Sequence, residues 1–404
     1  MSAYLDHAAT TPMHPEAIEA MLPFLDQRFA NPSGGHRMAR DARRAIDDAR
    51  DVFAAATGAR SGDVVFTSGG TESDNLAVFG ASKAGTSFDG GAAAPAGVVV
   101  CPATEHHAVL DPVLALDGRI VAVDATGRLD LDDLARVLEA AAARAAEGGS
   151  AGVRLVSIMA VNNEVGTVQP LAEAAELVRR LAPDAVLHTD AVQAFCWTDL
   201  SEVAAPADLL SLSAHKFGGP KGVGVLVVRD GVALRPRQLG GGQERGRRSG
   251  TQNVAGIVAA AEAARLTLGR RAAEVERITK LRDRLLDGLL ASVPGLVETA
   301  AVADPGGPDR SGRVPGVAHV CIDGVESEAL LFLLERSEIY ASAASSCSSG
   351  AMEASHVLAA MGVAPELAGG SLRLSLGWST TEAEVDHAIA AIPPAVERLR
   401  SFGI

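Results

Sequence analysis

SLSAHKFGGPKG, residues 211–222, is the stretch that decides the fold of this chain. An apolar run at 208–212 opens into a polar turn, and glycines lead from that turn to a second apolar run at 223–228. This pattern predicts a buried strand, a turn and another buried strand. Lys216 lies at the mouth of the turn, where loss of hydration lowers the pKa of an amine, as Schiff-base formation requires. A single lysine after a strand is nevertheless most often a solvated loop residue, so the rest of the chain must decide its role.

Apolar runs and helical patterns alternate around this stretch. Short apolar runs of strand length are separated by segments in which apolar residues recur at helical spacing, and Gly58 provides a stop signal after the first long helix. The alternation predicts an α/β domain with a mostly parallel sheet. The expected strands are 64–67, 98–101, 120–123, 155–160 and 185–187, and the expected helices are 36–57, 129–146 and 171–182.

The pattern changes after residue 253. A long helical stretch at about 254–293, which Gly269 could interrupt, leads to a Gly/Pro-rich segment at 304–316. Strand-like and helix-like segments then alternate to the C-terminus, which predicts a second, smaller α+β domain. We therefore expect a large domain at residues 15–255, and a small domain made of residues 1–14 together with 256–404.

The bulk composition excludes several classes of protein. The chain has 404 residues, and no uninterrupted apolar run reaches the 18 or more that a membrane span needs. The start of the sequence lacks the basic and apolar segments of a secretory signal, so we expect a cytoplasmic protein. The net charge of -14 argues against nucleic acid as the main ligand. The four cysteines include no CxxC pair, so we expect reduced thiols and no metal site.

Polar residues follow the predicted strands, where ligands bind in parallel sheets. Gly70 and Thr71 open a helix whose amides suit a phosphate, Asp190 suits a protonated ring nitrogen, and His106 suits stacking on an aromatic ring. Each residue alone is more often a turn or cap residue. With Lys216 as covalent anchor they match the phosphate, pyridine nitrogen and aldehyde of pyridoxal phosphate. Other polar residues that follow strands are Asn163, Gln193, Ser213 and His215.

Six motifs in order make the chain closely resemble the NifS/IscS-type cysteine desulfurases, which are fold-type I pyridoxal-phosphate enzymes. The resemblance runs from YLDHAATTP at Tyr4 to SLRLSLGWSTTEAEVD near the C-terminus. It implies an α/β fold of that type, with conversion of L-cysteine to L-alanine. The motifs are TSGGTESDNLA (67–77), EHHAVL (105–110), VNNEVGTVQP (161–170), HTDAVQA (188–194), SAHKFGGPKGVG (213–224) and GGGQERGRRSGTQN (240–253).

The resemblance also implies a role for each matching residue around pyridoxal 5'-phosphate. Lys216 would carry the cofactor, Asp190 would pair with its ring nitrogen, and Gln193 would contact its hydroxyl. His106 would stack on the ring and shuttle protons. The phosphate would be bound by Gly70, Thr71, Ser213 and His215, with Asn163 beside the ring.

The arginine-rich loop at 243–251 has two interpretations. Its arginines could form a nucleic-acid patch, but the glycines within it and the acidic chain argue against this. In the family that the chain resembles, the residue matching Thr251 reaches the phosphate of the neighbouring subunit. The resemblance therefore implies a homodimer with active sites at the interface.

Cys347 lies among small residues at 341–351, which have little to pack, so we expect a mobile loop there. The other cysteines, Cys101, Cys196 and Cys321, lie in or beside apolar runs and are expected in the core. By resemblance Cys347 is the nucleophile that takes the substrate's sulfur as a persulfide, for which it must be a thiolate.

Arg373, in SLRLSL, alternates with apolar residues as if it pointed from a strand into a site. A guanidinium fork suits a carboxylate, and the resemblance assigns Arg373 to the substrate carboxylate, assisted by Asn31 in the NPSGGH turn. The sequence departs from the commoner family pattern at SSCSSG and at His107, where lysine is frequent. Neither departure removes a catalytic group.

These observations predict a cysteine desulfurase. It would supply persulfide sulfur to acceptor proteins, such as an iron-sulfur scaffold or tRNA and cofactor thiolation enzymes. The nearest alternative is another fold-type I enzyme, such as a selenocysteine lyase or an aminotransferase. A third is a non-catalytic sulfur carrier or regulatory partner that retains the fold, although an intact Lys216, Asp190, His106 and Cys347 weigh against it.

Overall fold

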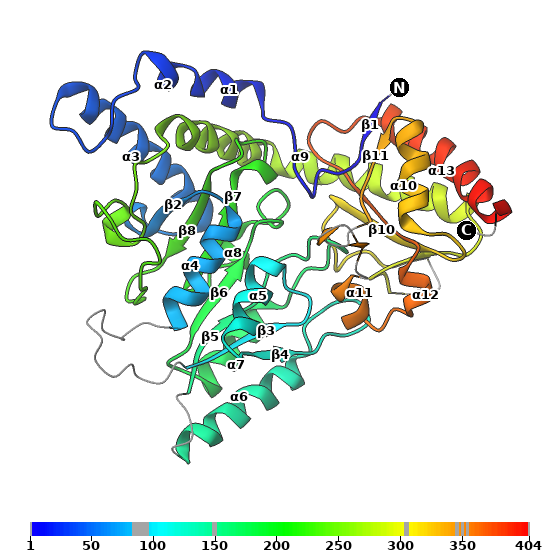
Figure 1. Cartoon of the computed structure of the whole chain (residues 1–404), viewed down its shortest axis with the longest axis horizontal. Coiled ribbons are helices and arrows are strands. Elements are labelled where there is room, and N and C mark those ends of the chain that lie inside the picture. The colour runs from blue at the N-terminus through cyan, green and yellow to red at the C-terminus, as the bar shows by residue number, and fades with distance from the viewer. Residues whose placement is uncertain are drawn as a thin grey trace.

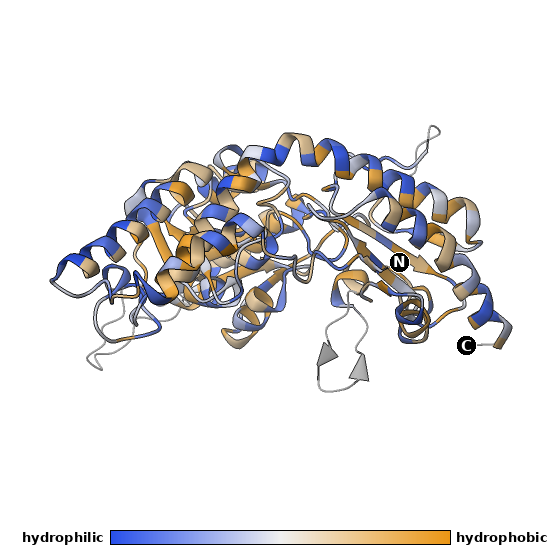
Figure 2. Cartoon of the chain, turned by 90° about the horizontal axis from the view of Figure 1, so that it is seen from above, coloured by the Kyte–Doolittle hydropathy of each residue, from blue (hydrophilic) through white to orange (hydrophobic). Residues whose placement is uncertain are grey.

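The computed structural model of the protein describes residues 2–82, 97–147, 152–302, 307–343 and 355–402, with the backbone alone of 347–348 and 351–352. A large α/β part and a smaller part are joined by one long helix, α9 (Val254–Ser292) (Figure 1). Seen from above, the molecule is elongated and curved, and the apolar strands lie between helices (Figure 2). Among the residues that the structure describes, no helix has the length and apolar character needed to span a membrane.

The large part is built on a seven-stranded sheet in the order β2-β8-β7-β6-β5-β3-β4. The strands from β7 to β4 are parallel, whereas β8 is antiparallel to both β2 and β7, which confirms the expected mostly parallel sheet. Most strand residues are buried and are Val or Leu, as in sheets covered on both faces. The strands are β2 (Val64–Thr67), β3 (Val98–Pro102), β4 (Arg119–Val121), β5 (Val153–Ser157), β6 (Val186–Asp190), β7 (Leu209–Ser213) and β8 (Gly224–Val228).

Helices flank this sheet, and three of them lie at the expected segments 36–57, 129–146 and 171–182. Helix α3 (Arg37–Thr57) ends at Gly58, whose φ of 61° is the left-handed conformation that glycine adopts most easily. The other helices of this part are α1 (Pro15–Met21), α2 (Pro23–Asp26), α4 (Gly70–Ser82), α5 (His107–Ala115), α6 (Leu131–Ala146), α7 (Leu171–Leu181) and α8 (Leu200–Val203).

The central stretch has the predicted form of a strand, a turn and a strand. Strand β7 runs into the 3-10 turn Ala214–Lys216, and the chain returns as β8. Phe217, the next residue after Lys216, is buried, with its ring centroid 4.4 Å from that of Phe195 and 6.3 Å from that of Phe53 on α3. This aromatic cluster fixes the turn that carries Lys216 against the helical layer.

The smaller part contains a three-stranded antiparallel sheet in the order β14-β10-β9. The N-terminal strand β1 (Ala3–Tyr4) joins this part by pairing with β11 (Ile339–Tyr340). The remaining elements are β9 (Leu296–Glu298), β10 (Val317–Ile322), β12 (Cys347–Ser348), β13 (Ala351–Met352), β14 (Ser371–Ser375), α10 (Ser327–Arg336), α11 (His356–Ala360), α12 (Pro365–Ala368) and α13 (Glu382–Phe402).

Helix α9 continues through Gly269 without the break that the sequence suggested. Gly269 is exposed and a Cβ there would contact nothing, so the helix bears only the modest propensity cost of a glycine. The first half of α9 packs into the core of the large part through residues such as Ile257, and the second half packs into the core of the smaller part through Leu285 and Leu289. One rigid helix therefore belongs to both cores.

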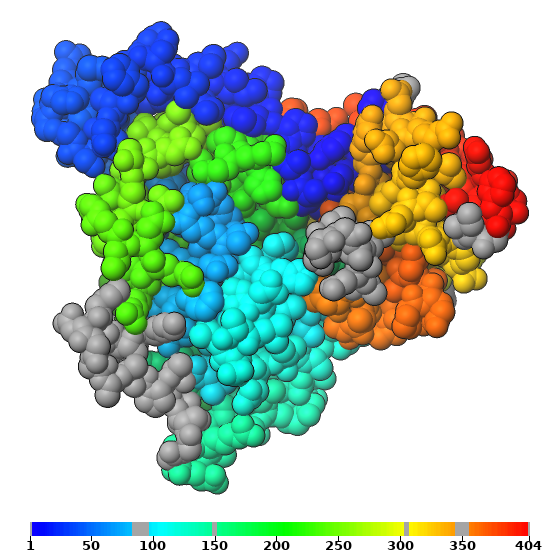
Figure 3. Space-filling view, in the orientation of Figure 1, coloured from blue at the N-terminus to red at the C-terminus, as the bar shows by residue number. Residues whose placement is uncertain are grey.

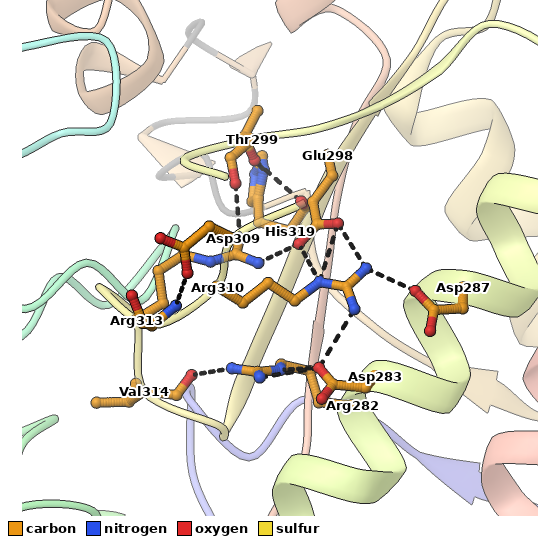
Figure 4. Close-up of polar contacts among 11 residues, drawn as sticks. Arg282, Asp283, Asp287, Glu298, Thr299, Asp309, Arg310, Arg313, Val314 and His319 are labelled. Atoms are coloured by element: carbon orange, nitrogen blue, oxygen red, sulfur yellow. Dashed lines mark hydrogen bonds and ion pairs between the residues drawn. The ribbon is translucent and has the colours of Figure 1, made fainter. Parts of the chain in front are cut away.

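A network of ion pairs ties α9 to the smaller sheet (Figure 4). The carboxylate of Glu298 on β9 is almost completely buried and is bound by both Arg310 and Arg313. Arg310 also reaches Asp287 on α9 at 2.9 Å and Asp283 at 3.3 Å. Each buried charge has an opposite partner, so the segment that carries the two arginines is held firmly to the smaller part.

The same segment also contacts the large part. Val168 N donates to Gly312 O, and Val314 N donates to Gly166 O, each at 2.9 Å. These bonds fix the loop that follows β5, which carries Asn163. The ion-pair network therefore stabilises the position of one wall of the candidate site.

Candidate active site

The predicted site residues meet at a cavity of about 360 Å³ at the carboxyl ends of the central strands. The walls come from the ends of β6 and β7, the start of α4, the loop after β5, the N-terminal segment and β14. Ten of the predicted residues line this cavity: Gly70, Thr71, His106, Asn163, Asp190, Gln193, Ser213, His215, Lys216 and Arg373.

Three other predicted residues are placed differently. Asn31 and Thr251 do not line the cavity formed by the described residues, and the Asn31 carboxamide accepts from Ser33 N at 2.9 Å in its own turn. The side chain of Cys347 lies outside the described residues, and only its backbone is placed, in β12. The structure therefore brings together the expected cofactor pocket and leaves these three roles as predictions.

Lys216 is held at the cavity wall by the N-terminal segment. Its Nζ donates to Ala8 O at 2.5 Å and to Ala9 O at 2.9 Å. Burial, and next the positive charge of Arg373, lower the pKa of Lys216 to about 8, while Asp190 and Asp6 oppose this shift. The shift has the direction expected for a lysine at a buried turn, so a neutral amine is available near neutral pH.

Asp190 ends β6, next to the turn of Lys216. Its Oδ1 accepts from Val192 N at 2.9 Å, and burial raises the pKa of this carboxyl group. Burial also raises the pKa of Asp74 on α4, which the neighbouring Asp190 raises further, and Asp74 Oδ1 has no hydrogen-bond partner among the residues with described positions. Two buried carboxyl groups with incomplete partners favour a cation beside them.

The start of α4 supplies a place for an anion. The first amides of a helix have no carbonyl partner within the helix, and here they belong to Gly70 and Thr71. A Cβ at Gly70 would come within 3.0 Å of Val192 Cγ2, so only glycine leaves this wall undisturbed. Ser213 and His215 line the same cavity, and His215 Nδ1 lies 3.2 Å from Thr10 Oγ1.

These groups fit the three handles of pyridoxal phosphate. The free helix amides suit the phosphate, the under-paired carboxyl groups suit the protonated ring nitrogen, and the amine of reduced basicity suits the aldehyde. His106 caps α5 by accepting from Ala108 N at 3.1 Å and opens onto the cavity. Burial of the imidazole, and next the positive charge of Lys216, lower the pKa of His106 to about 4. The ring is therefore neutral at pH 7.

Arg373 reaches the cavity from the smaller part. The residue is 5% exposed, its Nη1 donates to Asn163 O at 3.0 Å, and its Nη2 pairs with Asp6 Oδ1 at 2.8 Å. Its Nε has no partner among the described residues. Arg373 lines the cavity, and a buried guanidinium group there is suited to bind a carboxylate.

Several residues at the site were not predicted from the sequence. Asp6, Ala8 and Ala9 belong to a quoted motif. Ala8 and Ala9 contact Lys216, 208 and 207 residues away in sequence, and Asp6 contacts Arg373, 367 residues away, so no spacing shows these contacts. Glu164 lines the cavity, and burial raises its pKa to about 7. Glu164 follows Asn163 directly in the sequence, so its position after a predicted strand could also have indicated a site residue.

Comparisons with known proteins agree with this geometry. Residues 3–387 match the family described as Aminotransferase class-V. The chain is 42% identical to an IscS-like cysteine desulfurase of Mycobacterium tuberculosis, covering 98% of this chain and 97% of that protein. It is 38% identical to the cysteine desulfurase IscS of Dictyoglomus turgidum, covering 99% and 95%.

Solved structures show the same similarity. A NifS-like protein superposes with a TM-score of 0.85 at 32% identity, covering 98% of this chain and 100% of that chain. A structure described as SspA in complex with cysteine superposes with a TM-score of 0.75 at 28% identity, covering 93% and 99%. The architecture therefore has close counterparts among solved structures.

The lowered pKa of Lys216 can be measured in protein freed of cofactor. Labelling with an amine reagent across a pH series, followed by peptide mass spectrometry, should show Lys216 losing its proton near pH 8. The exposed Lys221 is the reference in the same digest. A midpoint for Lys216 near the ordinary lysine value of about 10.4 would contradict the described environment.

Proposed function

This chain belongs to the class-V aminotransferase family and is a cysteine desulfurase that uses pyridoxal phosphate, and on this premise we propose how its residues divide the reaction. The observation that supports the assignment most strongly is the convergence of Lys216, Asp190, the α4 amides and Arg373 on one cavity. The first three match the cofactor's handles, and Arg373 matches the carboxylate of an amino-acid substrate. L-Cysteine, which the SspA structure contains, is the substrate that we propose.

We propose that Lys216 carries the cofactor and moves protons at Nζ. Its lowered pKa supports both roles, since the amine can lose and regain a proton near neutral pH. Asp190 would hold the ring nitrogen in its protonated form, and Gln193 would contact the ring hydroxyl. His106, neutral at pH 7, would stack on the ring and accept a proton. When bound, pyridoxal phosphate withdraws electrons from the substrate and so weakens its carbon-sulfur bond.

The phosphate end of the site is proposed on the same grounds. The amides of Gly70 and Thr71, with Ser213 and His215, would bind the phosphate group. Burial, then the charge of Lys216, lower the pKa of His215 to about 4, so this imidazole would act as a neutral hydrogen-bonding group. Asn163 would lie beside the ring.

We propose that Cys347 takes the sulfur. Its thiolate would attack the sulfur of the substrate, forming a sulfur-sulfur bond as the carbon-sulfur bond breaks. The electron pair of the broken bond stays on the substrate, which becomes alanine after protonation, and the enzyme keeps a persulfide. The described cysteines are poorly suited to this role, because burial raises the pKa of both Cys196 and Cys321 to about 12.

Replacing the proposed nucleophile tests this function. Cys347→Ser should retain the absorption of the bound cofactor but lose at least about a hundredfold in alanine and sulfide production from L-cysteine, since a hydroxyl is a poor acceptor of sulfur. Cys321→Ala, in the core of the same part of the molecule, is the matched control and should retain turnover. Normal alanine production by Cys347→Ser would contradict the assignment of Cys347.

We further propose that two copies of the chain form the active enzyme. Residues Pro32 and Ser33, beside Asn31, line one groove with residues 241–245 and with Gln252, beside Thr251. Figure 3 shows the blue N-terminal segment and the green segment that precedes α9 side by side at one end of the molecule. Asn31 and Thr251 thus lie on one face, as they would if they served the site of a second copy. Exposed apolar side chains on the nearby N-terminal helices and turns support an interface: Ile18, Leu22, Leu25, Phe29 and Met38.

A charged residue in this face should separate the subunits. We expect sedimentation equilibrium to give twice the chain mass of 41.3 kDa for the unaltered protein and a shift toward 41.3 kDa for Phe29→Glu. Phe332→Glu, on α10, alters another exposed phenylalanine and should leave the dimer intact. A monomeric unaltered protein would contradict the proposal, as would an unchanged mass for Phe29→Glu.

The remaining proposals concern the sulfur, the compartment and the domains. We propose that the persulfide passes to acceptor proteins of iron-sulfur cluster assembly or of tRNA and cofactor thiolation, in the cytoplasm, and labelled sulfur from cysteine would identify them.

We also propose that residues 15–255 form one domain and that 1–14 with 256–404 form the other. The two apolar cores support a division of this kind, although the first half of α9 packs into the core of the large part. Hydrogen exchange that opened both cores together would contradict it.

A further inference from the structure

The N-terminal segment is a backbone neighbour of the strand that carries Arg373. Ser375 N donates to Leu5 O at 2.7 Å, and His7 N donates to Ser375 O at 3.3 Å. Asp6 therefore lies alongside β14. Figure 1 shows the N-terminal segment passing from β1 in the smaller part to α1 of the large part. The first residues of the chain are fixed where the two parts face each other across the cavity.

The contacts of Arg373 are divided unequally around its guanidinium group. Asn163 O occupies Nη1, and the carboxylate of Asp6 occupies Nη2, whereas the buried Nε has no partner in the part of the chain that the structure describes. Nε and Nη2 form one edge of the planar group, and each Nη carries two N–H bonds. Contacts to the two Nη atoms can therefore fix the plane and leave the N–H of Nε available.

This inference rests on the proposed function, in which Arg373 binds the substrate carboxylate. We propose that Asp6 is a positioning residue, which holds the guanidinium group of Arg373 in the orientation that binds the substrate carboxylate. Asp6 does not itself touch the substrate in this account.

A second carboxyl group near Arg373 makes a positioning residue necessary, because it could also attract the guanidinium group. Glu164 lines the same cavity, and the charge of Arg373 acts on its pKa, so the two are within electrostatic reach. Besides its ion pair with Asp6, Arg373 also acts on the pKa values of Lys216, His319 and Tyr4. Without Asp6, the buried guanidinium would lose its anionic partner and would be drawn toward Glu164, away from the substrate.

The same segment also positions the cofactor's anchor. The carbonyls of Ala8 and Ala9, two and three residues after Asp6, accept from Lys216 Nζ. Gln193 Nε2 also donates to Ala8 O, at 2.8 Å. Residues 6–9 therefore set the separation between the amine that holds the cofactor and the guanidinium that holds the substrate carboxylate.

Asp6→Asn in the holoenzyme tests the proposal. We expect the KM for L-cysteine to rise about tenfold, on the order of one charge-assisted hydrogen bond, with kcat changed less than about twofold. The dissociation constant of 3-mercaptopropionate, which has the carboxylate but no amine, should rise in parallel when measured by ligand-observed NMR. Inhibition by cysteamine, which lacks a carboxylate, should not change. Asp6→Ser should show the same pattern.

Glu384→Gln is the matched control. Glu384 Oε1 accepts from Tyr4 N at 3.2 Å, so this change also replaces a carboxylate that anchors the N-terminal segment, but it leaves the partner of Arg373 in place. We expect unchanged KM, unchanged 3-mercaptopropionate binding and unchanged cysteamine inhibition. If Asp6→Asn and Asp6→Ser behave like Glu384→Gln, Asp6 has no positioning role.

Arg373→Gln separates failure of this inference from failure of the proposed function. If Arg373→Gln leaves both KM and 3-mercaptopropionate binding unchanged, Arg373 does not bind the substrate carboxylate and its proposed role is wrong. If it weakens both, Asp6→Asn added to Arg373→Gln should cause no further loss, because Asp6 acts through Arg373. A full additional loss in the double variant would overturn the positioning role alone.

Discussion

The burial of a lysine at the end of a sheet strand is the constraint on which the site depends. An ammonium group that loses water must gain acceptors or opposite charge, or give up its proton. Lys216 has two backbone carbonyls from the N-terminal segment and the negative charges of Asp190 and Asp6, and its pKa is still lowered to about 8. The chain thus stabilises an amine that is close to giving up its proton.

The topology of the sheet brings the partners of this lysine together. Asp190 and Ser211 are paired in register on β6 and β7, so the carboxylate and the turn that carries Lys216 emerge side by side. Helix α4 begins at the same edge, and β14 adds Arg373 from the smaller part. The N-terminal segment contacts both Lys216 and Arg373, so it fixes the distance between two residues that are far apart in sequence.

Much of this could be predicted from the sequence, because the signals are local. The strand, turn and strand around Lys216 follow from apolar runs and glycines, and the cavity residues follow from their places at strand ends. The unbroken helix at Gly269 could not be predicted, since packing at both ends of α9 outweighs one exposed glycine. The pairing of Asp6 with Arg373 spans 367 residues and depends on tertiary structure alone. Cys347 rests on resemblance, because its side chain lies outside the described residues.

The central claim is that Lys216 is the cofactor's anchor, and chemical trapping tests it most directly. The protein would be incubated with pyridoxal phosphate, reduced with borohydride and digested, and the peptides would be mapped by mass spectrometry. The account predicts a phosphopyridoxyl group on Lys216 alone among the four lysines of the chain, which are Lys83, Lys216, Lys221 and Lys280. Labelling of Lys221 in its place, or an unlabelled Lys216, would contradict it.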